Sequence, residues 1–318
     1  MSAIEVQELT RTFVSGRRRH RKTIEAVKAI SFSVDRGERV AFIGPNGAGK
    51  STSIKMLTGI LHPTSGAASV LGLVPWTERR TLAASIGTLF GQRSLLWQEL
   101  TPRISYRMLG AIFGLDDRQT DRRIAELGEL LDAVDLFDQP VRTQSLGQRM
   151  RCELAACMLH DPDLLVLDEP TIGLDLLAKR RFRDLLVQLN TELGATVFLT
   201  SHDVADIEHV ANRAIVVNHG DIIYDAPVAE MRGDLLATKQ IDVGLEHPDD
   251  AARLMAAFTS PIAVSTPSTF VVRLDVDTSV TPIRSVLDTV LRTISVADLS
   301  VVDPPLEQVI GEIYERPA

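Results

Sequence analysis

The chain has 318 residues, with 34 Lys and Arg against 42 Asp and Glu, a formal net charge of −8 at pH 7 and 45% hydrophobic residues. This composition is typical of a soluble globular protein, and it excludes the disordered and fibrous classes. The length predicts one large domain and a smaller one. An overall acidic chain also argues against a dedicated nucleic-acid binder, which concentrates positive charge on one face.

Three features bear on location and redox chemistry. The N-terminal MSAIEVQELTRTF lacks an apolar stretch, so no secretory signal is expected. Cys152 and Cys157 lie in an apolar helical segment without a second Cys or His pair nearby, which indicates core thiols. The segment 254–272 has no charged residue, but its two prolines and six Ser or Thr predict a loop between elements rather than a membrane span.

From about residue 39 to residue 217, strand-like patterns recur between helical ones. A β-rich run at 39–43 leads into a glycine-rich loop and then into an apolar helical pattern. Continuous apolar runs of the kind found in strands covered on both faces follow at 164–167, 196–200 and 214–217. Helical segments such as 179–193 separate them. The alternation predicts an α/β fold with a mostly parallel sheet.

Two other regions have a different pattern. Between Leu100 and Leu159 the sequence is almost wholly helical, which predicts a helical subdomain inserted into the α/β core. From Thr269 to Asp277 apolar and polar residues alternate, and helical spacing follows from Ile283 to Ile294, so a small C-terminal α+β appendage is expected. Residues 240–318 contain 5 basic and 12 acidic side chains, so this tail carries most of the net charge. The residues predicted to share the core face of the strand are Phe270, Val272, Leu274 and Val276.

The glycine-rich loop matches the pattern G-x-x-x-x-G-K-[ST] and lies between a predicted strand and a predicted helix. Its glycines let backbone N–H groups turn inward around phosphate oxygens, and the following helix adds its partial positive charge. Lys50 is expected to reach the β- and γ-phosphates, and the Ser51 hydroxyl to bind Mg²⁺. The predicted nucleotide-binding residues here are Gly44, Pro45, Asn46, Gly47, Ala48, Gly49, Lys50, Ser51 and Thr52.

Two carboxylates end the apolar run Leu-Leu-Val-Leu-Asp-Glu. A buried strand that delivers Asp168 to its tip suits a carboxylate that positions Mg²⁺. Glu169 beside it is placed to orient or deprotonate an attacking water, so it is the candidate catalytic base.

Together these motifs resemble the ATP-binding subunits of ABC transporters over about residues 4–232. The resemblance implies a P-loop NTPase fold of the ABC type. It also gives roles to residues that carry little signal alone. Gln92, in Phe-Gly-Gln-Arg-Ser, corresponds to the glutamine that contacts Mg²⁺ and water, and His202 to the switch histidine that contacts the γ-phosphate. Asp175 falls in the D-loop, and Phe13 at the aromatic that stacks on adenine.

The signature motif departs from the family's usual Leu-Ser-Gly-Gly-Gln, because Gln144 and Leu146 stand at its first and third positions. Ser145 can still donate to a γ-phosphate, and Gly147 has no Cβ to obstruct its N–H. The residues expected to contact the partner subunit's ATP are Ser145, Leu146, Gly147 and Gln148. This variant signature and the C-terminal appendage resemble the ATPases of ABC-2-type exporters.

The resemblance implies a homodimer in which each ATP lies between the P-loop of one copy and the signature of the other, with ATP and Mg²⁺ bound. It implies hydrolysis coupled to transport, with export expected, through a separate integral membrane permease. The chain itself is expected to be cytoplasmic and peripheral on the cytoplasmic face of the cell membrane. No nucleic acid partner is expected. The expected domains are an ATP-binding domain at 1–235, with its helical subdomain at about 93–160, and an accessory or regulatory α+β domain at 236–318.

Three alternatives stay open. A non-transport ABC-type ATPase acting in assembly or on the ribosome is disfavoured by the single Gly-Lys-Ser loop and by the long C-terminal extension. The basic run Arg17–Lys22 could bind anionic lipid or nucleic acid, although without interleaved aromatic residues it is more typical of a solvated hairpin loop. The appendage could also be a passive structural extension.

Overall fold

The computed structural model describes residues 2–15, 22–90, 93–201, 203–235, 238–258 and 261–302. The chain divides into two compact units, Met1–Val228 and Ala229–Ala318. Helix α8 (Val228–Leu235) starts at the boundary, and all of it except Val228 belongs to the second unit.

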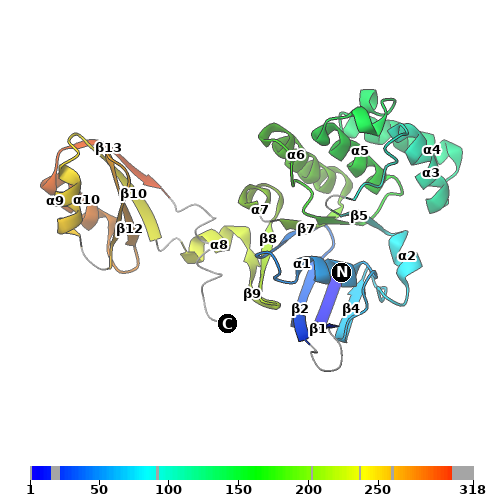
Figure 1. Ribbon diagram of the computed structural model, residues 1–318, viewed down its shortest axis with the longest axis horizontal. Helices are drawn as coiled ribbons and strands as arrows, with labels where there is room; N and C mark the ends of the chain where they lie inside the picture. The colour runs from blue at the N-terminus through cyan, green and yellow to red at the C-terminus, as the bar shows by residue number, and fades with distance from the viewer. Residues whose placement is uncertain are drawn as a thin grey trace. The chain divides into compact units, whose positions relative to one another are not determined.

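A six-stranded sheet of order β5-β6-β7-β3-β8-β9 is the centre of the first unit (Figure 1). Its first five strands are parallel, and β9 pairs antiparallel to β8. The predicted parallel α/β sheet is confirmed, because the apolar runs of the sequence form its central strands. The strands are β5 (Ile86–Phe90), β6 (Leu164–Asp168), β7 (Thr196–Ser201), β3 (Arg39–Ile43), β8 (Arg213–Asn218) and β9 (Asp221–Pro227).

A second sheet, antiparallel and of order β2-β1-β4, was not predicted from the sequence. It consists of β2 (Lys22–Asp35), β1 (Ser2–Ser15) and β4 (Ser65–Val70). One hydrophobic core joins both sheets and helix α1 (Lys50–Leu57). Within it the rings of Phe32 and Phe198 stack with centroids 6.0 Å apart, and Phe42 packs against both. This core holds the strand that leads into the P-loop.

The helical subdomain follows β5, as predicted. Figure 1 shows its helices grouped beyond the β5 edge of the six-stranded sheet. Tyr106 packs edge-on against Phe137 at 4.9 Å between centroids. Cys152 and Cys157 are buried free thiols, and burial raises the pKa of Cys152 to about 11. The helices are α2 (Arg79–Ala83), which precedes β5, and then α3 (Pro102–Phe113), α4 (Asp117–Leu130), η1 (Val134–Leu136), η2 (Val141–Thr143) and α5 (Leu146–Met158).

The second unit has a four-stranded antiparallel sheet of order β11-β12-β10-β13 and its own hydrophobic core. Val272, Leu274 and Val276 are buried on one face of β12, as the alternation predicts. Phe270 precedes the strand and is 53% exposed, so its assignment to the core was wrong. The elements are β10 (Thr238–Leu245), α9 (Asp250–Ala257), β11 (Ala263–Ser268), β12 (Val271–Asp277), α10 (Ile283–Thr293) and β13 (Val296–Val302).

The prediction of a loop over residues 254–272 was also wrong. The segment contains the end of α9, all of β11 and the start of β12. Pro267 is accommodated because β11 is an edge strand, whose pairing with β12 is irregular between Ser265 and Ser268. Among the helices of the described residues, none has the length and apolar character needed to cross a bilayer.

Candidate functional site

The P-loop is fixed by two close backbone approaches that only glycine permits. A Cβ at Gly44 would lie 2.2 Å from the carbonyl oxygen of Val217 on β8. Gly49 has φ of +109°, and a Cβ there would lie 2.4 Å from the carbonyl oxygen of Ala26 on β2. The loop from the end of β3 to the start of α1 is therefore packed between β8 and β2.

Lys50, the first residue of α1, extends its side chain back over the loop. Its Nζ donates to the carbonyl oxygens of Gly44 (2.6 Å) and Pro45 (3.3 Å), and it lies 3.9 Å from Oε1 of Glu169. The side chain is 7% exposed. Burial lowers the pKa of the ammonium, while the charges of Glu169 and Asp168 oppose that shift. The cation is thus held at the loop, where a phosphate oxygen could accept its hydrogen bonds.

Asp168 ends β6 next to the start of α1. Its Oδ1 accepts from the hydroxyl of Thr200 at 2.7 Å and from that of Ser51 at 3.4 Å. Parallel pairing of β6 with β7 brings Thr200 directly alongside Asp168. Carboxylate and hydroxyl oxygens are hard ligands that suit Mg²⁺, so the donor set fits the predicted metal. Thr200 was not predicted, although its place as a polar residue at the end of an apolar strand could have indicated it.

Glu169 takes a left-handed backbone conformation, with φ of +53°. Its backbone N–H donates to the carbonyl oxygen (3.2 Å) and the hydroxyl (3.1 Å) of Thr200. This turn directs the carboxylate toward Lys50. The left-handed conformation is unfavourable for a non-glycine residue, which indicates that the surrounding contacts fix it.

The signature residues surround the start of α5. Ser145 caps the helix by accepting from the N–H of Gln148 (3.3 Å), and the Gln148 side chain accepts from the N–H of Ser145 (2.8 Å). A Cβ at Gly147 would lie 2.8 Å from that of Ala178, so the glycine allows α5 to pack on α6 (Leu176–Leu193). Leu146 is 40% exposed. A pocket of about 240 Å³ opens here, lined by Ser145, Gly147, Gln148 and the start of α6.

Asp175 caps α6 by accepting from the N–H of Ala178 at 2.8 Å. It also lines the pocket beside the signature. No hydrogen bond or ion pair in the described part of the chain joins residues 145–148 to residues 44–52. The fold thus brings the P-loop, Asp168 and Glu169 together, and separately brings the signature next to Asp175.

Phe13 lies on β1, paired with Ile24 of β2, and is 38% exposed. The guanidinium of Arg11 lies over its ring at 4.7 Å from the centroid. This cation–π contact orients the ring. Gln92 and His202, the two remaining predicted site residues, lie outside the described residues, as do residues 17–21 of the basic run.

One functional candidate was missed by the sequence patterns. Glu153, on α5, is 2% exposed. It accepts from the N–H of Leu95 (2.8 Å) and from the hydroxyl of Ser94. Burial raises its pKa, and these hydrogen bonds offset part of that shift. The sequence did contain a signal for this residue, because Glu153 is an acidic residue among the apolar residues of a predicted helix. These hydrogen bonds connect the segment that begins at residue 93 to α5, the helix that starts with the signature residues.

Comparison with known proteins identifies the family. The family described as ABC transporter matches residues 27–172. The ATP-binding protein NatA of Bacillus subtilis is 30% identical over 204 residues, which cover 64% of this chain and 82% of that protein. The Nod factor export ATP-binding protein I of Neorhizobium galegae is 33% identical over 267 residues, covering 83% of this chain and 73% of that protein.

Solved structures agree. The chain is similar to cbiO1 of Clostridium perfringens, described as part of the ABC transporter complex cbiONQ, with TM-score 0.64 and 26% identity, covering 73% of this chain and 91% of that one. It shares its fold with the post-hydrolysis dimer of the cassette MJ0796, with TM-score 0.62 and 23% identity, over 71% of this chain and 98% of that one. From the arrangement of the P-loop with Asp168 and Glu169, and from these relatives, we conclude that the chain belongs to the ABC transporter ATP-binding proteins.

Proposed function

We propose that this ABC ATPase hydrolyses ATP in order to energise transport, with export favoured, through a separate membrane permease. The observation that carries the proposal is the meeting of Lys50, Ser51, Asp168 and Glu169 at one edge of the sheet. Phosphoryl transfer depends mainly on positioning and on stabilising charge, which this set of side chains can provide.

Each of these side chains has a separate role in the proposal. Lys50 binds the β- and γ-phosphates, with the backbone of residues 44–49 around them. The oxygens of Ser51 and Asp168 hold Mg²⁺, which when bound neutralises phosphate charge. Glu169 accepts the proton of the attacking water. The family resemblance adds Gln92 at the metal and water, His202 at the γ-phosphate and Phe13 on the adenine.

We propose that the functional form is a homodimer. Among the described residues no hydrogen bond or ion pair joins the signature to the P-loop, which leaves the signature available to a second copy. Ser145, Gly147 and Gln148 line an open pocket at the start of α5. In the dimer this pocket faces the partner's ATP, and ATP therefore acts as a ligand that favours association.

We propose that the permease docks on α3. Ile104, Met108 and Ile112 follow one another at four-residue intervals and are 48%, 42% and 70% exposed, whereas Tyr106 and Gly110 face the core. The next residues round the helix, Leu109 and Phe113, line an apolar pocket of about 190 Å³ with β5 and α5. An apolar surface of this kind suits a cytoplasmic helix of a membrane protein. The attachment would place the ATPase at the cytoplasmic face of the membrane.

This docking surface can be tested by charge substitution. Ile112→Glu should lower the membrane-associated fraction of the chain about five- to tenfold, because a charge placed at the centre of a contact is expected to cost about 1.0–1.4 kcal/mol of binding free energy. The fraction is measured by fractionating cells that express the natural permease. Leu193→Glu is the matched control, since Leu193 is 47% exposed at the end of α6. Equal membrane fractions for both variants would exclude α3 as the docking surface.

Export is favoured because relatives include proteins named for Nod factor export and for probable multidrug transport.

For the second unit we propose an accessory, regulatory role, since it has its own core. Ending the chain after Val228 should change the transport rate without abolishing ATP hydrolysis. If neither rate changed, the unit would be a passive extension.

A further inference from the structure

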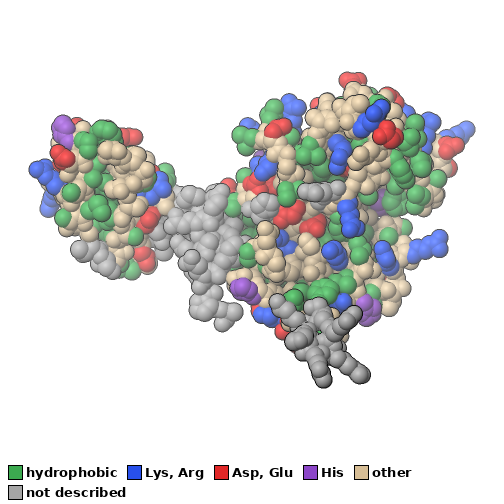
Figure 2. Space-filling view, in the orientation of Figure 1, with side chains coloured by type: hydrophobic (Ala, Val, Ile, Leu, Met, Phe, Trp, Pro, Cys, Tyr) green, Lys and Arg blue, Asp and Glu red, His purple; other side chains and the backbone are tan. Residues whose placement is uncertain are grey.

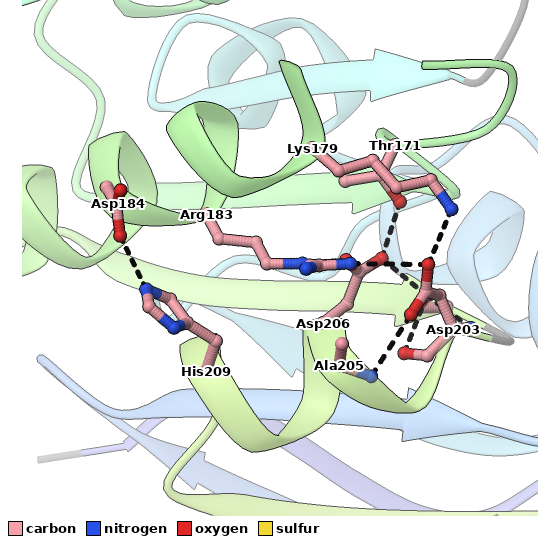
Figure 3. Close-up of polar contacts among 9 residues, drawn as sticks. Thr171, Lys179, Arg183, Asp184, Asp203, Ala205, Asp206 and His209 are labelled. Carbon is pink, nitrogen blue, oxygen red and sulfur yellow. Dashed lines mark hydrogen bonds and ion pairs between the residues drawn. The ribbon is translucent and has the colours of Figure 1, made fainter. Parts of the chain in front are cut away.

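A buried cluster of polar residues lies beside the ATP site, and the roles proposed above do not use it (Figure 3). Asp206, on α7 (Val204–Val210), is at its centre. Its Oδ1 accepts from Nε of Arg183 at 2.5 Å, and its Oδ2 accepts from the hydroxyls of Ser201 (2.7 Å) and Thr171. One carboxylate therefore binds three separate segments of the chain.

Asp203 extends the cluster toward α6. Its Oδ2 accepts from Nζ of Lys179 (2.5 Å) and lies 3.2 Å from Nη2 of Arg183. Partial burial would raise the pKa of Asp203, but the hydrogen bond from Lys179 and the two positive charges outweigh it and hold that pKa below its usual value. Two cations thus balance two carboxylates.

The two charged side chains at the centre of the cluster are almost fully buried, so their positions are tightly constrained. Arg183 is 6% exposed and Asp206 is 1% exposed. A charged group so far from water requires its partners, because an unpaired buried charge is costly. Each hydrogen bond of the cluster consequently fixes where the neighbouring backbone can lie.

The segments that meet at Asp206 are the ones that carry the proposed catalytic groups. Thr171 lies two residues after Glu169. Ser201 and Asp203 flank position 202 on both sides, and the Asp203 N–H also donates to the Ser201 hydroxyl (2.9 Å). The turn of Glu169 is itself bonded to Thr200, the neighbour of Ser201. The turn after β6 is therefore joined to the end of β7 twice, once through Thr200 and once through Asp206, which also binds Ser201.

From this geometry we propose that Asp206, held by Arg183, is a positioning residue for ATP hydrolysis. It keeps the turn of Glu169 in register with Ser201 and Asp203, and it does not touch ATP. This inference rests on the proposed function. Misplacing a reacting group by about 1 Å can cost about 10²-fold in rate, so a small loosening of these turns should appear in kcat.

The same two helices provide a matched control. Asp184 of α6 accepts from His209 of α7 at 2.6 Å, and both side chains are about half exposed. Figure 3 shows this pair apart from the cluster. Asp184→Asn therefore makes the same chemical change between the same helices without touching Thr171, Ser201 or Arg183.

The experiment compares kcat and KM for Mg–ATP in the full chain and its variants. Asp206→Asn should lower kcat about 10- to 100-fold and leave KM within about twofold, because Lys50 and Ser51 are not in the cluster. Thr171→Val, which removes one hydroxyl with little change in shape, should lower kcat about three- to tenfold, and Thr171→Ser should restore it. Asp184→Asn should match the unmodified chain.

The outcomes separate this inference from the proposed function. If Asp206→Asn and Thr171→Val both turn over at the rate of Asp184→Asn, the positioning role is wrong. If Asp206→Asn does not fold, Thr171→Val and Thr171→Ser still decide the question. A parallel loss of ATP affinity would indicate general disruption and would also overturn it. Failure of the proposed function would instead appear as absent turnover by the unmodified chain, or as unchanged turnover in Glu169→Gln.

Discussion

Replacing Glu169 with Gln is expected to lower ATP turnover by about 10²–10³-fold while ATP binding is kept, because the amide cannot accept the proton of the attacking water. Glutamine has the same shape, and the backbone of residue 169 is held by Thr200, so the turn should persist. The measurement is the rate of phosphate release by the purified chain, with nucleotide affinity determined in parallel.

The same variant should accumulate an ATP-bound dimer, since ATP that is not hydrolysed continues to favour association. Sedimentation with and without ATP reports this directly. Turnover at the unmodified rate would remove Glu169 from the role of base. A chain that stays monomeric at saturating ATP would contradict the proposed arrangement of the two copies.

Lys50→Met is expected to weaken ATP binding about 10- to 100-fold. Hydrogen bonds to a charged group contribute about 1.5–3 kcal/mol, and each 1.4 kcal/mol corresponds to a factor of ten. Methionine keeps much of the length of the side chain but has no donor for phosphate. Affinity is measured with a fluorescent ATP analogue or by calorimetry.

A lysine on the same helix provides the control. Lys55 lies in the last turn of α1 and is exposed, so Lys55→Met makes the same change away from the loop. It should bind ATP as the unmodified chain does. If both variants bound ATP normally, the assignment of Lys50 to the phosphates would be wrong.

The sequence predicted those parts of the fold whose signal is local. The apolar run of β3, the glycine loop and the start of α1 are contiguous, and their order alone places Lys50 at the start of a helix, directly after the loop that follows a buried strand. The tip of β6 similarly placed Asp168 and Glu169. The meeting of the two motifs followed from parallel pairing, since the carboxyl ends of such strands lie at one edge of the sheet.

Other features depended on contacts distant in sequence. The three-stranded sheet pairs β1 with β4, and neither strand alternates simply, because pairing shifts interrupt the register. The sequence predicted a loop at β11, because this edge strand is polar and contains Pro267. Asp206 and Thr200 look ordinary in the sequence, and only the fold brings them to Arg183 and Asp168.

The sequence predicted how net charge is divided along the chain, but not which charged side chains pair with one another. On the face shown in Figure 2, basic and acidic side chains are interspersed over the first unit. The Arg213 guanidinium, for example, pairs with Asp225 and Glu38, which raises its pKa. Several positive charges of this unit are thus neutralised locally within the fold.

The proposed function requires a separate membrane protein on which this ATPase acts. Its most direct test is to isolate tagged Glu169→Gln chain from its native membranes in the presence of ATP and to identify by mass spectrometry the protein recovered with it. The expected result is an integral membrane protein with several spans, recovered in stoichiometric amount and about five- to tenfold less abundant when Ile112→Glu is also present. Recovery of the chain without any membrane protein, or with ribosomal or assembly components in its place, would contradict it.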